Sequence, residues 1–396
     1  MQTIRTKEVG LILLAIFCQM FSCLNLAFLN KYIETFTVTD LFFTQNRLDL
    51  SYWIIVTVFA RIFGSYFVGL RAEREGVYKA IIFVSKIFVI ISALCAAFCI
   101  SLESNEAYRS GFYCFRFFYS LLETASLILP YLYILDRRSF ANCYRLSALF
   151  LGVMFFAKLA SYYLIELPLN YLRFWYVLPL LASIIAVGIY QSLQKSLDLV
   201  NKSLQDIKGA SLRIKLLAGL LGAACAAGIF YHYFFGSYYS LNIKIIEPAA
   251  DLGSVMYYSL CAVFFMPSAW ICKKYNLYRV LQFSLIALLS IGIISVFITA
   301  HFVVDILQQV LFSFFTSLFI TPLLGIVYKL YKESGDIKAI LTAFVVGFGA
   351  CTTLARFEQQ FALQKGFGWV TYDISLLLCL LAVCSNKEFL EKKVTP

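Results

Sequence analysis

Long apolar stretches alternate with short polar segments along almost the whole chain. A membrane-spanning helix needs about 20 mainly apolar residues, and by this measure the pattern predicts twelve spans. They lie near residues 8–30, 51–70, 77–100, 110–135, 146–166, 172–191, 214–238, 250–271, 279–300, 305–328, 339–362 and 368–385. The pattern therefore predicts an all-α integral membrane protein with twelve transmembrane helices.

The longest polar connection lies between the sixth and seventh predicted spans. Within it, Leu193, Leu197, Val200 and Leu204 follow helical spacing, which predicts an amphipathic segment at the membrane surface. The connection divides the chain into an N-terminal six-helix bundle (1–190), a cytoplasmic linker (191–213) and a C-terminal six-helix bundle (214–396).

Composition supports the membrane class and excludes a soluble one. Of the 396 residues, 61% are hydrophobic and 14% are charged, whereas soluble domains are about 45–50% apolar and about 25% charged. Most of the 33 Lys and Arg residues fall in alternate connecting segments. This bias predicts that both termini are cytoplasmic. The net charge of +11 is thus explained by orientation in the bilayer, and nucleic acid is not an expected partner.

A charged motif separates the second and third predicted spans. It reads G-x-x-x-E-R-x-G-x-x-K from Gly69 to Lys79, and a weaker copy runs from Ala269 to Arg279. The motif resembles the hallmark loop G-x-x-x-D-R-x-G-R-K of the major facilitator superfamily, which is weakly repeated between the eighth and ninth helices. The resemblance covers the whole chain. It implies two related six-helix halves that rock around a central site.

The charged motif is the predicted gating loop. We expect Gly69 and Gly76 to permit a tight turn, and Glu73 and Arg74 to form a latch between helix pairs. The other members of the predicted loop are basic: Lys79 in the first copy, with Lys273, Lys274 and Arg279 in the second. The alternative is a solvated charged turn that only fixes the orientation of the helices.

A second resemblance concerns the segment from Phe59 to Gly69. It is similar to the approach to the hallmark loop in the metabolite–proton symporters, which include proline/betaine, citrate and α-ketoglutarate permeases. Ile62 stands where that family has proline, and residues 116–120 follow its fourth-helix signature only in part. The solute is not carried over from this resemblance.

Four basic residues lie well inside predicted spans of the first half: Arg61, Lys86, Arg116 and Lys158. Each would cost about 2.5–3.5 kcal/mol at the centre of a bilayer, so we expect them to face a polar cavity. With Tyr119, which shares a helical face with Arg116, they are the predicted binding residues for a small organic anion. The alternative is that they snorkel to the interface or form structural ion pairs.

Glu123 is the deep carboxylate of the first half and shares the stripe of Arg116 and Tyr119. A buried carboxylate suits reversible proton transfer, so Glu123 is the predicted proton-coupling residue. Alternatively, it neutralises Lys86 or Lys158.

The second half carries its charged residues toward the outer ends of the spans. Glu358 and Asp373 are among them, and interface anchoring or outer-gate pairs explain them. The aromatic run that begins at Tyr231 is expected to form an interfacial belt. The alternative for one or two of its members is that they line a pocket.

These features predict a secondary transporter that couples uptake of a small organic anion, a carboxylate or phosphorylated metabolite, to protons. The same class includes an exporter or an uncoupled facilitator, and a non-transporting receptor or scaffold is the other alternative. No metal or nucleotide motif occurs, so neither an enzyme nor a cofactor is expected. We expect a monomer in a bacterial inner membrane.

Overall fold

The fold is described from a computed structural model in which every regular element of the described part is a helix. The described residues are 54–77, 79–84, 86–87, 90–91, 94, 114, 117–118, 120–122, 128–129, 132, 148–149, 151–152, 155–156, 159, 209–231, 248–297, 302–362 and 370–391. The chain forms two compact units, residues 1–134 with 157–206 and residues 135–156 with 207–396. The predicted boundaries 1–190, 191–213 and 214–396 stay a prediction.

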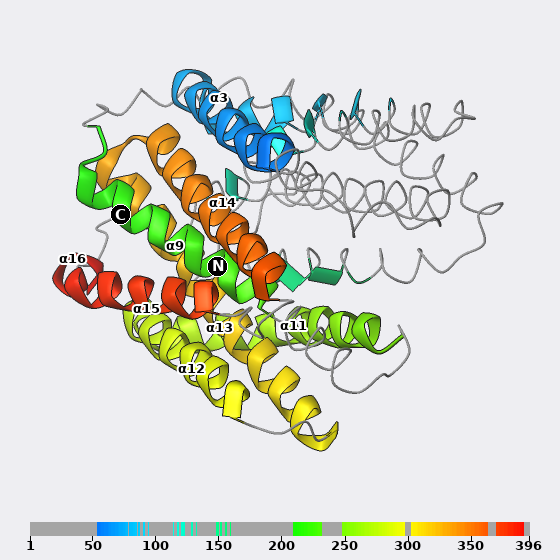
Figure 1. Ribbon diagram of the computed structural model, residues 1–396. Helices are drawn as coiled ribbons and strands as arrows, with labels where there is room; N and C mark the ends of the chain where they lie inside the picture. The colour runs from blue at the N-terminus through cyan, green and yellow to red at the C-terminus, as the bar shows by residue number, and fades with distance from the viewer. Residues whose placement is uncertain are drawn as a thin grey trace, which may run out of the picture. The chain divides into compact units, whose positions relative to one another are not determined.

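The helices match the apolar spans of the sequence. In chain order they are a π-helix η1 (Ile54–Phe59), α3 (Ala60–Glu75), α9 (Leu212–Phe230), α11 (Pro248–Lys274), α12 (Leu277–Phe297), α13 (Phe302–Ser334), α14 (Ile337–Ala362), α15 (Val370–Ser385) and α16 (Lys387–Glu391) (Figure 1). Five helices, α9, α11, α12, α13 and α14, each contain a segment that is long and apolar enough to cross a membrane, and α15 is a shorter apolar helix. Helix α13 extends beyond the predicted span 305–328 at both ends.

Helix α3 buries a face of small residues in the first unit. The buried positions include Ala60, Gly64, Val68 and Ala72, spaced one helical turn apart. At Gly64 another helical segment comes so close that a Cβ atom would overlap the backbone of Leu121. Gly64 therefore allows a close approach of the two helical segments.

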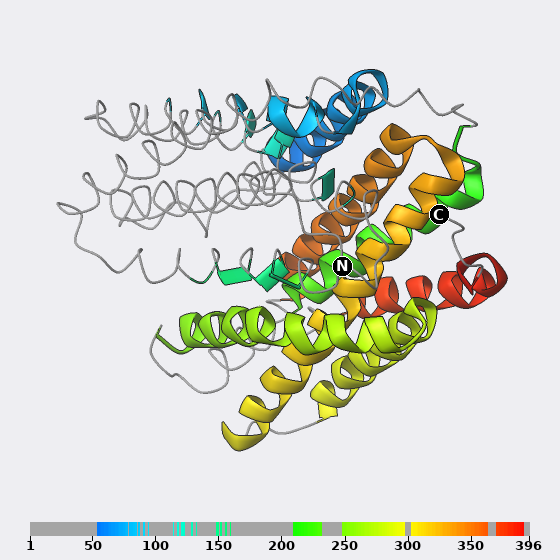
Figure 2. The same ribbon diagram turned by 180° about the vertical axis from the view of Figure 1, so that it is seen from behind.

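The second unit is built around α9. This helix packs against α14, α15 and α13, and Figure 2 shows it from behind among these neighbours. The contact with α14 brings two backbones together, because a Cβ on Gly222 would overlap the carbonyl of Phe344 and a Cβ on Gly347 would overlap Gly219. Glycines at these positions therefore set the distance between α9 and α14.

Hydroxyl and thiol groups join α11 to α13. Cys261 Sγ donates to the carbonyl oxygen of Ser313 at 3.5 Å, and Ser317 Oγ donates to that of Cys261 at 3.2 Å. Small residues thus allow close packing while their polar atoms are satisfied within the bundle.

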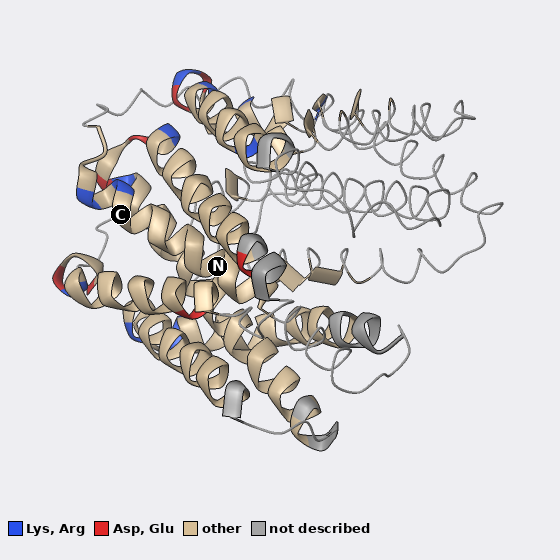
Figure 3. Cartoon of the chain, in the orientation of Figure 1, with Lys and Arg blue, Asp and Glu red and all other residues tan. Residues whose placement is uncertain are grey.

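Polar contacts tie together the helix ends on one side of the second unit. The backbone N–H of Ala210 donates to Asp336 Oδ2 at 3.2 Å, and Arg213 Nε donates to Asn386 Oδ1. Lys329 Nζ donates to the carbonyl oxygen of Leu390 in α16 at 2.8 Å. Within this unit, Figure 3 shows blue Lys and Arg segments at helix ends and long tan stretches between them, as expected for helices that cross a bilayer.

Candidate functional site

The two copies of the charged motif have the same backbone architecture. Helix α3 ends at Glu75 and a helical segment resumes after Gly76; α11 ends at Lys274 and α12 begins after Asn276. The amide of Ala80 donates to the carbonyl oxygen of Gly76 at 3.2 Å, and the amide of Val280 makes the equivalent bond to Asn276 at 3.1 Å. The duplication predicted from spacing thus extends to the fold of both connections.

The turn itself is shorter than predicted. Gly69 lies inside α3, so the expectation that it forms part of the turn is wrong. Gly76 forms the break with φ of 92°, a conformation that favours glycine. In the second copy Asn276 takes this place, and its Oδ1 accepts a hydrogen bond from the amide of Tyr278 at 2.9 Å, which caps α12.

The charged members of the predicted gating loop lie at these helix ends. Glu73 is half-buried in α3, whereas the basic members are exposed: Arg74, Lys79, Lys273, Lys274 and Arg279. Arg71 pairs with Glu75 at 3.0 Å within the last turn of α3, an exposed pair of small energetic value. The proposed latch between Glu73 and Arg74 and a facing element stays a prediction.

Arg61 lies on a buried polar stripe. Its side chain is 6% exposed, and Thr57 and Ser65, one turn before and one turn after it, are also buried. The stripe begins in the π-helix η1, a rare element that is frequent at functional sites. Ser65 Oγ has no hydrogen-bond partner among the residues that the structure describes. Arg61 therefore faces the interior of its unit, as the cost of membrane burial predicted.

The other predicted binding residues are described only in part. Lys86 is half-buried. The remaining three, Arg116, Tyr119 and Lys158, lie outside the described residues, as does the predicted proton-coupling residue Glu123. Ser120, which shares the helical face of Arg116, Tyr119 and Glu123, is fully buried, and its neighbour Leu121 is the residue that contacts Gly64.

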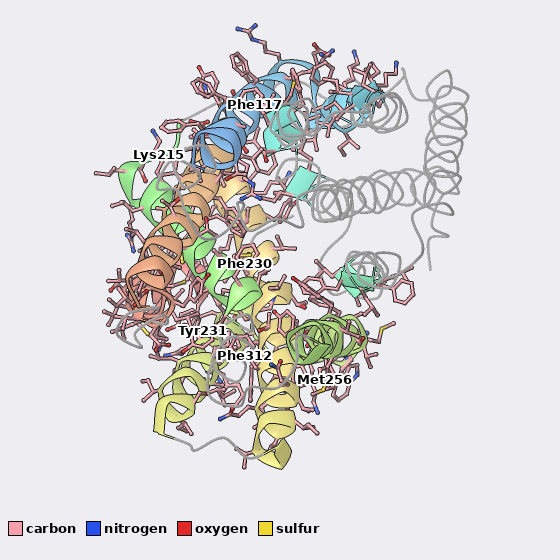
Figure 4. All side chains as sticks on the ribbon, turned by 45° about the vertical axis from the view of Figure 1, so that its right-hand side comes forward. Phe117, Lys215, Phe230, Tyr231, Met256 and Phe312 are labelled. Carbon is pink, nitrogen blue, oxygen red and sulfur yellow. The ribbon has the colours of Figure 1, made fainter. Side chains whose placement is uncertain are left out.

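A second polar cluster lies inside the second unit and was not predicted. Asp373, near the start of α15, is 8% exposed, and the Tyr231 hydroxyl donates to its Oδ1 and Oδ2 at 3.3 and 3.4 Å. Figure 4 labels Tyr231 beside Phe312 of α13, and their ring centroids are 5.3 Å apart. The expectation that Tyr231 belongs to an interfacial belt is wrong, because the residue is buried and packs its ring against Phe312 of α13 and Tyr372 of α15.

Glu358 forms a helix cap, and its predicted role as an interface anchor or outer-gate partner stays a prediction. Its Oε1 accepts the backbone N–H of Val370 at 3.0 Å, and its Oε2 accepts that of Thr371 at 2.9 Å. Glu358 of α14 thus satisfies two of the first free amides of α15 and places a negative charge at its positive end.

Aromatic and hydroxyl groups extend this cluster toward α11. The Tyr257 hydroxyl donates to the carbonyl oxygen of Gly228 at 2.7 Å, and Thr316 Oγ1 donates to the same oxygen at 3.3 Å. Within the described ranges, no group of three His, Cys, Asp or Glu side chains could hold a metal ion. The cluster around Asp373 and Tyr231 therefore offers hydroxyl groups, aromatic rings and a carboxyl group for binding or proton transfer.

Solved structures with the same fold cover nearly the whole chain. The proton:xylose symporter XylE bound to 6-bromo-6-deoxy-D-glucose matches with a TM-score of 0.70 at 12% identity, over 97% of this chain and 96% of that one. The outward conformation of FucP matches with a TM-score of 0.59 at 16% identity, over 96% and 99% of the two chains. The human organic anion transporter MFSD10 (TETRAN) matches at 0.64 and 12%, over 95% and 99%.

The chain has the major facilitator fold. This finding confirms the predicted all-α integral membrane class, and the predicted twelve helices agree with it. No protein-family model and no curated protein matches the sequence. The solved structures that share the major facilitator fold are transporters.

Proposed function

We propose that this protein is a secondary transporter that takes up a small organic anion together with protons by alternating access. The observation that carries the proposal is the buried stripe of Thr57, Arg61 and Ser65. An arginine that faces lipid would cost about 2.5–3.5 kcal/mol, whereas one directed inward can bind a carboxylate or phosphate through charge-assisted hydrogen bonds. The positive charge of the Arg61 guanidinium is the reason to propose an anionic solute.

Further support comes from the shared fold and from the sequence. MFSD10 is an organic anion transporter, and XylE is a proton symporter, so the fold accommodates both properties. Glu123 is the proposed proton carrier of the first half, and Arg116, Lys86, Lys158 and Tyr119 complete the proposed anion site. We propose a monomer in a bacterial inner membrane with both termini cytoplasmic.

Uptake by purified protein in sealed proteoliposomes tests the anion site. We compare organic carboxylates, phosphorylated metabolites and neutral sugars, with and without an imposed proton gradient. A charge-assisted hydrogen bond contributes about 1.5–3 kcal/mol, so Arg61→Gln should weaken apparent affinity for the anion about 10- to 100-fold. Lys215→Gln, which removes an exposed positive charge of α9, is the control. Equal uptake by Arg61→Gln and Lys215→Gln would refute the site.

Solute counterflow distinguishes the alternatives within the transporter class. A proton-coupled carrier should lose accumulation but keep counterflow when an uncoupler is added, whereas an uncoupled facilitator should show the same uptake in both conditions. An exporter should accumulate solute in inside-out vesicles. Binding without any counterflow would favour a receptor or scaffold.

A further inference from the structure

The carboxyl group of Asp373 is enclosed by three helices of the second unit. Tyr231 comes from the end of α9, Gly292 from α12, and Asp373 from the first turns of α15. A Cβ built on Gly292 would lie 2.5 Å from Asp373 Oδ1 and 2.6 Å from the Tyr231 hydroxyl. The absence of a side chain on Gly292 therefore makes room for this pair.

An ionised carboxylate would be poorly solvated at this position. Asp373 is 8% exposed, and its only hydrogen bonds to described residues are the two from Tyr231, both longer than 3.2 Å. The amides of Val370 and Thr371 at the start of α15 do not stabilise the Asp373 carboxylate, because they donate to Glu358. A buried charge with so few donors is costly, whereas a neutral carboxylic acid is not.

The groups that surround Asp373 supply no positive charge in the described part of the chain. Helix α9 presents Tyr231, α12 presents Gly292, and α14 presents the second acidic residue, Glu358, whose negative charge acts on Asp373. Tyr372 packs its ring against Tyr231, with centroids 5.7 Å apart. Helix α16 lies beyond the opposite end of α15. The enclosure thus favours loss of the negative charge by proton uptake.

We infer that Asp373 and Tyr231 form a proton-binding site in the second half of the protein, separate from Glu123 in the first half. Proton uptake forms one O–H bond on the carboxyl group and removes one negative charge, and release reverses both changes. The Tyr231 hydroxyl donates to the ionised form and can accept a hydrogen bond from the acid. The inference deepens the proposed proton coupling, but the site is defined without reference to the solute.

Infrared difference spectroscopy of the full chain in liposomes, recorded between acidic and alkaline pH, tests the inference. We expect a carboxylic acid C=O band that shifts in D₂O, is lost in Asp373→Asn and changes frequency in Tyr231→Phe. Glu388→Gln, which removes an exposed carboxylate of α16, is the control and should retain the band. These spectra need no transported solute, so a failure of the anion site leaves the result unaffected.

Two results would overturn the inference. The first is an unchanged acid band in Asp373→Asn, which would show that Asp373 does not change its protonation state over this pH range. The second is a carboxylate band of Asp373 that responds to added sodium but not to pH, which would indicate a metal cation in place of the proton. If Asp373→Asn does not fold, Tyr231→Phe decides alone, because an unshifted band in that variant contradicts the pairing.

Discussion

The close crossing of α9 and α14 gives a quantitative prediction for Gly222→Ala. The new Cβ would overlap the backbone carbonyl of Phe344, so no side-chain rotation can relieve the clash and the two helices must separate. Overpacking of this kind costs about 1–3 kcal/mol. The gain in helix propensity from Gly to Ala is about 0.5–1 kcal/mol, so it offsets only part of that cost.

Gly219→Ala is the matched control on the same helix. Its Cβ would lie 3.4 Å from the carbonyl oxygen of Ala343, an ordinary contact, so we expect unchanged or slightly higher stability. Gly347→Ala, which meets the backbone of Gly219 from the α14 side, should reproduce the loss seen in Gly222→Ala.

Thermal unfolding of the detergent-purified protein, followed with a thiol-reactive dye, measures the difference. Cys225 is buried in α9, so its thiol becomes reactive when the second unit opens. In a unit of this size, 1 kcal/mol shifts the midpoint by about 2–4 °C, and Gly222→Ala should therefore unfold several degrees below the wild type. If Gly222→Ala and Gly219→Ala unfold at the same temperature, the backbone contact does not set the helix distance.

Three further changes probe helix ends by thermal unfolding of the purified protein. Glu358→Ala removes both acceptors from the amides of Val370 and Thr371 and should cost about 1–2 kcal/mol; an unchanged midpoint would mean that water replaces the cap. Gly76→Ala adds a side chain where no atom lies within 4 Å, so it causes no clash. Because φ is 92° at this position, the backbone strain alone should lower the stability by about 1–3 kcal/mol. Asn276→Ala in the second copy should lower the stability less, by about 1 kcal/mol for the lost cap. If Asn276→Ala destabilises the protein more than Gly76→Ala does, the positive φ of Gly76 is not the main cost at this turn.

The helices could be predicted from apolar length, but not all of their ends. The apolar criterion stopped the second span at residue 70 because charged residues follow. Arg and Glu are good helix formers, however, and the Arg71–Glu75 pair supports the last turn of α3. The helix ends only where Gly76 adopts a conformation that other residues avoid.

The residues of the candidate sites could also be predicted only in part from the sequence. Burial of Arg61 was predictable because Arg61 lies well inside its predicted span, where a charge that faces lipid is costly. The role of Asp373 was not, since its position near a helix end indicated contact with water. Asp373 and Tyr231 are separated by 142 positions in the sequence, and no local pattern shows that they meet. The spacing of Thr57, four residues before Arg61, was the signal that could have completed the first stripe.

The hydrogen bond from Ala210 to Asp336 has a mechanical consequence. Asp336 also accepts the amide of Ala339 at 2.9 Å through its other carboxylate oxygen, so one side chain holds both the chain that enters α9 and the first turn of α14. Tension along the preceding polar segment would reach the start of α14 through this carboxylate without first unwinding α9. Helices α9 and α14, whose backbones meet at Gly222 and Gly347, would then move together.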